Sequence, residues 1–91
     1  MSQAKVLGII GGGQLGSMLC QAAKKVNIKT VIYCDDKNAP AQNFSDQFIN
    51  SSYENINKIN EFSNLVDVVT FEFENIPVPT LEIIKKIKPV Y

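Results

Sequence analysis

The sequence predicts a three-layer α/β fold, in which helices cover both faces of a four-stranded parallel sheet with the strand order 3-2-1-4. Three observations support this prediction. Short apolar segments alternate four times with segments of helical periodicity. A run of glycines joins the first apolar segment to the first helical segment. The 91-residue chain is 45% hydrophobic and 20% charged, which is typical of a folded domain.

The first strand and the first helix occupy the N-terminal third of the chain. Residues 6–10 are almost entirely apolar, as expected of a strand that is covered on both faces. Residues 14–26 follow as a helix, and Asn27 tolerates the left-handed conformation that ends many helices. Residues 30–34 form the second strand. The apolar residues that keep helical spacing on one face of the helix, the usual core-facing pattern, are Leu15, Met18, Leu19, Ala22 and Val26.

The middle of the chain supplies a short helical piece, the third strand and the second long helix. The helical piece begins at residues 39–41, where an early Pro40 does no harm through its missing N–H. A third short strand is expected near residues 47–49. Residues 55–64 predict a helix whose inward-facing residues are Ile56, Ile59 and Phe62.

The C-terminal third predicts the fourth strand and the last helix. The strand covers residues 66–71, and the helix opens near residues 77–80 with Leu81, Ile84 and Ile87 on its apolar face. Residues 89–91 have the sequence of a fifth strand that has only begun. We therefore expect residues 1–91 to be one domain, cut at its edge from a longer protein; a complete small protein with a frayed end is the alternative.

Composition excludes several classes of function. The formal net charge is zero, which argues against a dedicated nucleic-acid surface. All nine basic residues are Lys and there is no His, so neither an arginine clamp nor a zinc site is expected. No apolar run approaches the length of a membrane helix, and residues 1–5 do not have the pattern expected of a secretory leader. We expect a cytoplasmic protein in which Cys20 and Cys34 are reduced core residues.

The glycine run is the first candidate site. Gly11, Gly13 and Gly16 fit the pattern G-x-G-x-x-G between a strand and a helix. The first glycine permits a tight turn, the second lets a ligand approach the backbone, and the third lets the helix pack closely. The free N–H groups at the helix start attract anions. Close packing without a ligand is the other interpretation of these glycines.

The spacing of Asp35 leaves a dinucleotide site open. This residue follows the second strand and lies 19 residues after Gly16, where an acidic residue would bind the ribose of a dinucleotide. An NAD-binding, Rossmann-type domain of an oxidoreductase is therefore an alternative. A solvated turn at Asp35 and Asp36 would explain the same residues without a ligand.

An acidic strand end is the second candidate site. Glu72 and Glu74 alternate with Phe71 and Phe73 just where the fourth strand should end. In the order 3-2-1-4 the first and fourth strands flank the point where strand order reverses, so the glycine loop and Glu72 should meet in one crevice. A carboxylate there can accept a hydrogen bond from a substrate amine or hydroxyl. An exposed pair of glutamates on a loop is the alternative.

Three segments together resemble one enzyme family. They are residues 11–16 with Met18, residues 36–41, and residues 67–77. In this order they resemble the start of carboxyaminoimidazole ribonucleotide synthetase, the ATPase subunit of phosphoribosylaminoimidazole carboxylase. The Thr-Phe-Glu-Phe-Glu-Asn run at residues 70–75 is the most specific part of the resemblance.

The resemblance implies the first, pre-ATP-grasp domain of a three-domain, ATP-dependent ligase of de novo purine biosynthesis. ATP and Mg²⁺ would bind to the other two domains, outside this chain. Bicarbonate would be phosphorylated to carboxyphosphate, and the exocyclic amine of aminoimidazole ribonucleotide would then be carboxylated. The family also implies a homodimer, and residues 1–91 alone should be inactive.

The resemblance also implies a substrate-binding role for three residues. In the similar formate-dependent glycinamide ribonucleotide transformylase, the residues matching Gln14, Leu15 and Glu72 face the ribonucleotide. We add Gly13, whose backbone lies in the same loop, and we expect no catalytic residue in this chain. Ser17 departs from the family, which usually has Arg there. The lack of a nucleophile–base pair leaves open a third alternative, a module that serves interaction alone.

Overall fold

The structure of the chain is a computed structural model that describes residues 5–72 and 76–91. It contains four strands, three α-helices and one 3₁₀ helix within these residues. In chain order they are β1 (Val6–Ile10), α1 (Gln14–Lys25), β2 (Lys29–Cys34), the 3₁₀ helix η1 (Pro40–Asn43), β3 (Gln47–Asn50), α2 (Ile56–Leu65), β4 (Val68–Phe71) and α3 (Val78–Ile87).

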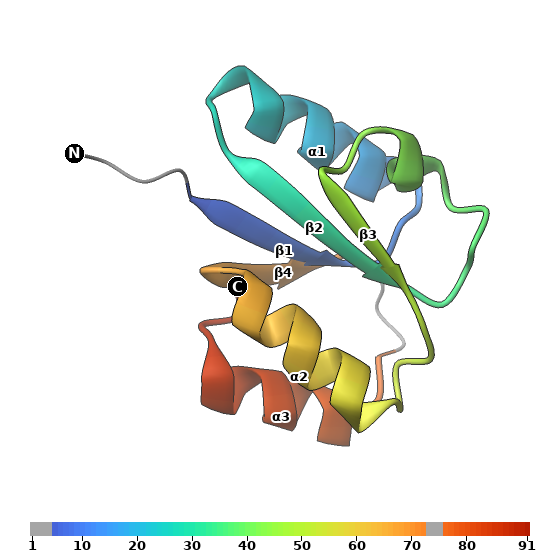
Figure 1. Cartoon of the computed structure of the whole chain (residues 1–91), viewed down its shortest axis with the longest axis vertical. Coiled ribbons are helices and arrows are strands. Elements are labelled where there is room, and N and C mark those ends of the chain that lie inside the picture. Colours follow the sequence, from blue (N-terminus) through green and yellow to red (C-terminus); the bar gives the residue numbers. More distant parts are fainter. Residues whose placement is uncertain (1–4, 73–75) are drawn as a thin grey trace.

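The strands form one parallel sheet in the order β3-β2-β1-β4, which confirms the predicted topology. Helix α1 and η1 lie on one face of the sheet, and α2 and α3 lie on the other face (Figure 1). The two strands at the centre, β1 and β2, are thus covered from both sides. This explains why both Ile9 and Ile10, which point to opposite faces, are completely buried.

Each face of the sheet has its own apolar core. Tyr33 and Phe62 are the largest fully buried side chains of the core on the α2 and α3 side, and their rings meet edge to face with centroids 5.5 Å apart. The core beneath α1 and η1 is made of smaller residues, namely Ile9, Cys20, Ile32, Cys34, Ala39 and Ala41. Both cysteines are free and buried, as the sequence predicted. Small side chains on this face let α1 approach the sheet closely.

The face of α1 that packs on the sheet is not the one that the periodicity predicted. Of the five apolar residues expected to face the core, Leu15, Met18 and Val26 are more than half exposed, Ala22 is exposed and Leu19 is only half-buried. The buried residues of the helix are Gly16, Ser17, Cys20 and Ala23. The prediction failed because it followed large apolar side chains, whereas the sheet accepts the small ones. Asn27 does adopt the predicted left-handed conformation, with φ 64°.

The second and third long helices agree better with the prediction. Ile59 and Phe62 of α2 and Ile84 of α3 are fully buried. Ile56 was also expected to face inward, but it lies in the first turn of α2 and is 45% exposed. The helix begins there because the side chain of Asn55 caps it, accepting a hydrogen bond from the backbone N–H of Lys58 at 3.2 Å.

A fifth strand begins beside β4, as predicted. Val90 forms an isolated parallel bridge with Val69. The backbone N–H of Val69 donates to Pro89 O at 2.9 Å, and that of Tyr91 donates to Val69 O at 2.8 Å. The fourth strand itself starts at Val68, two residues later than expected. The paired edge of the sheet therefore extends past β4.

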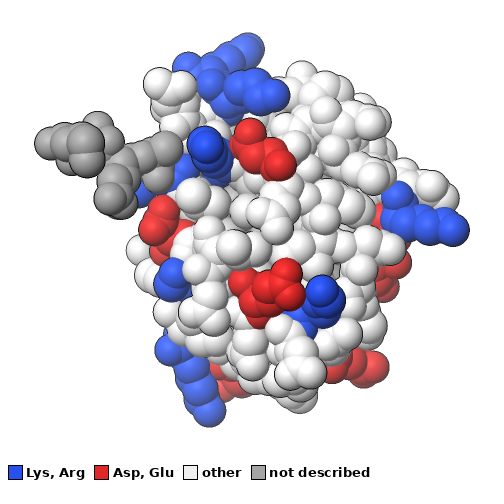
Figure 2. Space-filling model, in the orientation of Figure 1, with Lys and Arg blue, Asp and Glu red and all other residues white. Residues whose placement is uncertain are grey.

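Both signs of charge occur on the face of the molecule that Figure 2 shows. The face shown in Figure 2 carries Lys side chains interspersed with Asp and Glu, and neither sign forms a continuous patch there. None of the helices in the described part of the chain is long and apolar enough to cross a membrane.

Candidate functional site

The glycine loop after β1 is held by the backbone on both sides. The N–H of Gly11 donates to Tyr33 O at 2.8 Å and extends the pairing of β1 with β2 by one residue. The N–H of Ala41 donates to Gly12 O at 3.0 Å, which ties the loop to η1. Gly11 has φ 107°, a conformation that other residues rarely adopt. These hydrogen bonds therefore hold the loop in one conformation between β1 and α1.

Two of the glycines are required by close packing. A Cβ atom at Gly12 would lie 2.6 Å from the Cβ of Ala39, and one at Gly16 would lie 2.9 Å from the backbone O of Gly11. Both distances are shorter than real carbon contacts. Close packing therefore explains why residues 12 and 16 are glycines. It does not explain Gly13, where the nearest atoms to an added Cβ belong to the flexible side chain of Glu72.

Glu72 meets the loop at Gly13, as the strand order predicted. The backbone N–H of Glu72 donates to Ile10 O at 3.0 Å, so the residue continues the pairing of β4 with β1. Its carboxylate Oε1 accepts a hydrogen bond from the N–H of Gly13 at 2.8 Å. Gly13 is the N-cap of α1, whose first turn contains no acidic residue. Glu72 therefore supplies, from a distant strand, the negative charge that a helix N-terminus favours.

Gln14 and Leu15 stand beside this contact at the start of α1. Both are exposed, and the side chain of Leu15 is 53% accessible although it is apolar. Together the three side chains offer an amide, an apolar surface and a half-buried carboxylate at the same end of the sheet. Such a set can orient a ligand through hydrogen bonds and contact. The residues that the structure describes include no group of three or more metal-binding side chains.

Other residues singled out from the sequence lie elsewhere. Ser17 is 6% exposed and points into the packed side of α1 rather than outward. Asp35 is exposed directly after β2. Phe73 and Glu74 lie outside the described residues.

Sequence reasoning did not foresee the contribution of η1 to the loop. Ala39 and Ala41 pack against Gly12 and Gly16, and the N–H of Ala41 binds the loop backbone. The sequence feature that could have indicated this contact is the segment around Pro40, because residues 36–41 are among the segments that resemble the enzyme family. A short helix with small side chains fits there because anything larger would displace the loop.

The position of Glu72 disfavours a dinucleotide in this loop. In dinucleotide-binding domains the loop N–H groups at the helix start bind the pyrophosphate. Here the N–H of Gly13 is already bound to a carboxylate at 2.8 Å. A phosphate at the same place would meet a like charge at short range, which is unfavourable even near a protein surface.

Comparison with known proteins identifies the family of the chain. The family model of the ribonucleotide synthetase preATP-grasp domain matches residues 4–91. The N5-carboxyaminoimidazole ribonucleotide synthase of Staphylococcus epidermidis is 39% identical over 85 residues, which are 93% of this chain and 22% of that protein. The chain thus spans about a fifth of the length of such relatives.

Solved structures extend the similarity to three dimensions. The Staphylococcus aureus N5-carboxyaminoimidazole synthetase complexed with ADP is 32% identical, with a TM-score of 0.90 over 99% of this chain and 25% of that one. The Aspergillus clavatus synthase, in complex with ADP and 5-aminoimidazole ribonucleotide, is 30% identical, with a TM-score of 0.83 over 99% of this chain and 24% of that one. The chain belongs to the ribonucleotide synthetase preATP-grasp domain family.

Proposed function

We propose that this chain is the substrate-positioning, N-terminal domain of a longer ATP-dependent ligase that carboxylates 5-aminoimidazole ribonucleotide in purine biosynthesis. The observation that carries the proposal is the hydrogen bond between the Glu72 carboxylate and the N–H of Gly13. It fixes an acceptor at the point where strand order reverses, which is where ligands bind in such sheets. The relatives that share this fold are synthetases of the carboxylated product of this ribonucleotide.

In this proposal the loop orients the ribonucleotide and takes no part in proton transfer. Gly13, Gln14, Leu15 and Glu72 contact the substrate, with the carboxylate accepting a hydrogen bond from an amine or a hydroxyl. Holding the amine in a fixed geometry lowers the entropic part of the barrier to carboxylation. ATP and Mg²⁺, which bind outside residues 1–91, supply the activation of bicarbonate as carboxyphosphate.

The proposal extends to the assembly of the whole enzyme. The ADP bound in the S. aureus and A. clavatus relatives supports ATP as the nucleotide of the longer protein. The whole ligase acts as a cytoplasmic homodimer, and residues 1–91 have no activity alone because they lack the nucleotide-binding domains. The NAD-dependent oxidoreductase is not favoured, since the family and the carboxylate at Gly13 both point to another ligand.

The test uses the full-length ligase and three variants. Glu72→Ala should lower kcat/KM for the ribonucleotide about 10- to 100-fold, the range for a lost hydrogen bond to a charged group. Glu72→Gln keeps an acceptor for Gly13 but removes the charge, so it separates a folding defect from a binding defect. Both variants should leave the KM for ATP nearly unchanged. Glu82→Ala, which removes an exposed carboxylate from α3, is the matched control.

Three results would count against the proposal. Unchanged ribonucleotide kinetics in both Glu72 variants would remove the substrate role of this residue. Binding of NAD to the wild-type protein, measured by calorimetry and lost in Asp35→Ala, would restore the oxidoreductase alternative. A protein that binds neither ligand would favour the module that serves interaction alone.

A further inference from the structure

One face of the sheet is covered only in part. Val68 and Thr70 of β4 are in register with Leu7 and Ile9 of β1, so they point toward the same face as the core beneath α1. Val68 and Thr70 are only half-buried, whereas Val69, on the face covered by α2 and α3, is fully buried. Helix α1 packs on β1 and β2 and is flanked by η1. The α1-side face of β4 therefore lacks the cover that its other face has.

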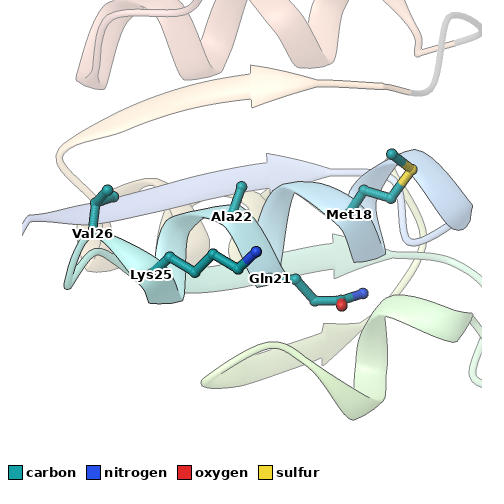
Figure 3. A pocket seen from close by; sticks show the side chains of 5 residues that line it. All are labelled: Met18, Gln21, Ala22, Lys25 and Val26. Carbon is teal, nitrogen blue, oxygen red and sulfur yellow. The ribbon is translucent and has the colours of Figure 1, made fainter.

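An apolar strip runs along α1 next to this uncovered face. Met18 is 59% exposed, Val26 is 65% exposed, and Ala22 lies between them with its side chain exposed as well. Figure 3 shows these three side chains on one flank of α1, on the side opposite to η1, while Gln21 points the other way. With Lys25 and Gln21 they line a shallow hollow on the surface. We call Met18, Ala22 and Val26 the α1 flank.

We propose that the α1 flank and the uncovered face of β4 together receive one amphipathic helix from the remaining part of the same polypeptide. This inference rests on the proposed function, in which the chain is about a fifth of a longer ligase. The flank residues lie four apart along the sequence, so they form a ridge along one side of the helix on which another helix can pack. The small Ala22 at its centre lets the backbones approach closely.

The size of the surface favours a tethered segment over a free partner. A stable interface between separate proteins buries about 800 Å² on each side and engages some 20 to 30 residues. The α1 flank and the exposed part of β4 amount to about five side chains. A helix of the same polypeptide does not lose the translational freedom that a separate molecule loses on binding. A small apolar surface is therefore sufficient for it.

Charge and topology describe the helix that would fit. Helix α1 ends in Lys24 and Lys25 and has no acidic residue in its first turn. The incoming helix should therefore carry a carboxylate opposite the last turn of α1, next to its apolar stripe. Val90, paired with Val69, widens the sheet beyond β4. This widening adds to the face that a covering helix would bury.

Oxidation of Met18 in the full-length ligase tests the proposal directly. Hydrogen peroxide oxidises exposed methionines, and mass spectrometry of peptides reads Met18 separately from Met1. We expect Met18 in the folded enzyme to be oxidised at least about tenfold more slowly than in the same enzyme unfolded in urea. This protection should persist on dilution to a monomer. Equal rates would overturn the proposal, and protection that disappears on dilution would assign the surface to a second copy instead.

A matched pair of variants provides an independent readout. Val26 and Val78 are similarly exposed, at 65% and 69%, but Val78 lies on α3 in the opposite layer. Val26→Gln should lower the melting temperature of the full-length ligase by about 2 to 4 °C, whereas Val78→Gln should not. Equal effects of the two variants would contradict the proposal. Ribonucleotide-dependent ATP turnover of the same preparations tests the proposed function separately, since an inactive enzyme with a protected Met18 would refute only that function.

Discussion

Glu72 is the residue on which local structure and proposed function meet. Its carboxylate closes the N-terminus of α1 through Gly13, a helix end that otherwise has no capping side chain. In the proposed ligase the same carboxylate would accept a hydrogen bond from the ribonucleotide. A carboxylate has several lone pairs, so it can serve both donors at once. The helix cap therefore also orients the acceptor for its ligand.

Replacing single glycines of the loop by alanine should show which glycine is needed for stability and which for ribonucleotide binding. At Gly16 a new Cβ would lie 2.9 Å from the backbone O of Gly11, which cannot move without the loop. At Gly13 it would lie 3.2 Å from Oε1 of Glu72, the end of a flexible side chain. We expect Gly16→Ala to lower the free energy of unfolding by about 1 to 3 kcal/mol, and Gly13→Ala to cost less.

Urea denaturation measures the difference in the free energy of unfolding between these two variants. Steady-state kinetics with the ribonucleotide then test the effect of each variant on substrate binding. Gly13→Ala should weaken ribonucleotide binding, because it displaces the Glu72 carboxylate from the loop. Equal losses of stability in both variants would show that the two glycines have the same structural role.

At the scale of elements, the order of the strands was predictable and the orientation of α1 was not. The alternation of apolar and periodic segments specifies a parallel sheet, and crossover handedness restricts its order. The meeting of Glu72 with the glycine loop follows from that order. The burial of Cys20 and Ala23 in place of Met18 and Val26 depends on how closely the helix approaches the sheet. A hydrophobicity pattern contains no information about that distance.

The start of α2 offers a test of helix capping. The side chain of Asn55 accepts a hydrogen bond from the N–H of Lys58 at 3.2 Å, which satisfies one of the free donors of the first turn. Asn55→Ala should lower the free energy of unfolding by about 1 kcal/mol. The control is Asn57→Ala, an exposed position inside the same helix, where alanine should be neutral or slightly stabilising. Thermal denaturation measures both variants. An equal change in melting temperature for the two would argue against the cap.

For the whole molecule, both cores contain weak acids that burial keeps protonated. Cys20 lies in the core beneath α1, and burial raises the pKa of its thiol above the usual 9.0. Tyr33 and Tyr53 lie in the core beneath α2 and α3, where burial raises the pKa of each hydroxyl above the usual 10.0. The folded state thus binds these protons more tightly than the unfolded state does.

The stability of the protein should therefore decrease at alkaline pH. A folded-state pKa above the unfolded value contributes stability that is complete below the unfolded pKa and is lost as the pH rises toward the folded one. The loss should begin near pH 9, where the thiol of unfolded Cys20 titrates, and steepen near pH 10, where the tyrosines follow. Urea denaturation between pH 7 and about 10.5 measures it. Cys20→Ala should lower stability at pH 7 but flatten the first part of the decline, and an unchanged slope in that variant would assign the decline to other groups.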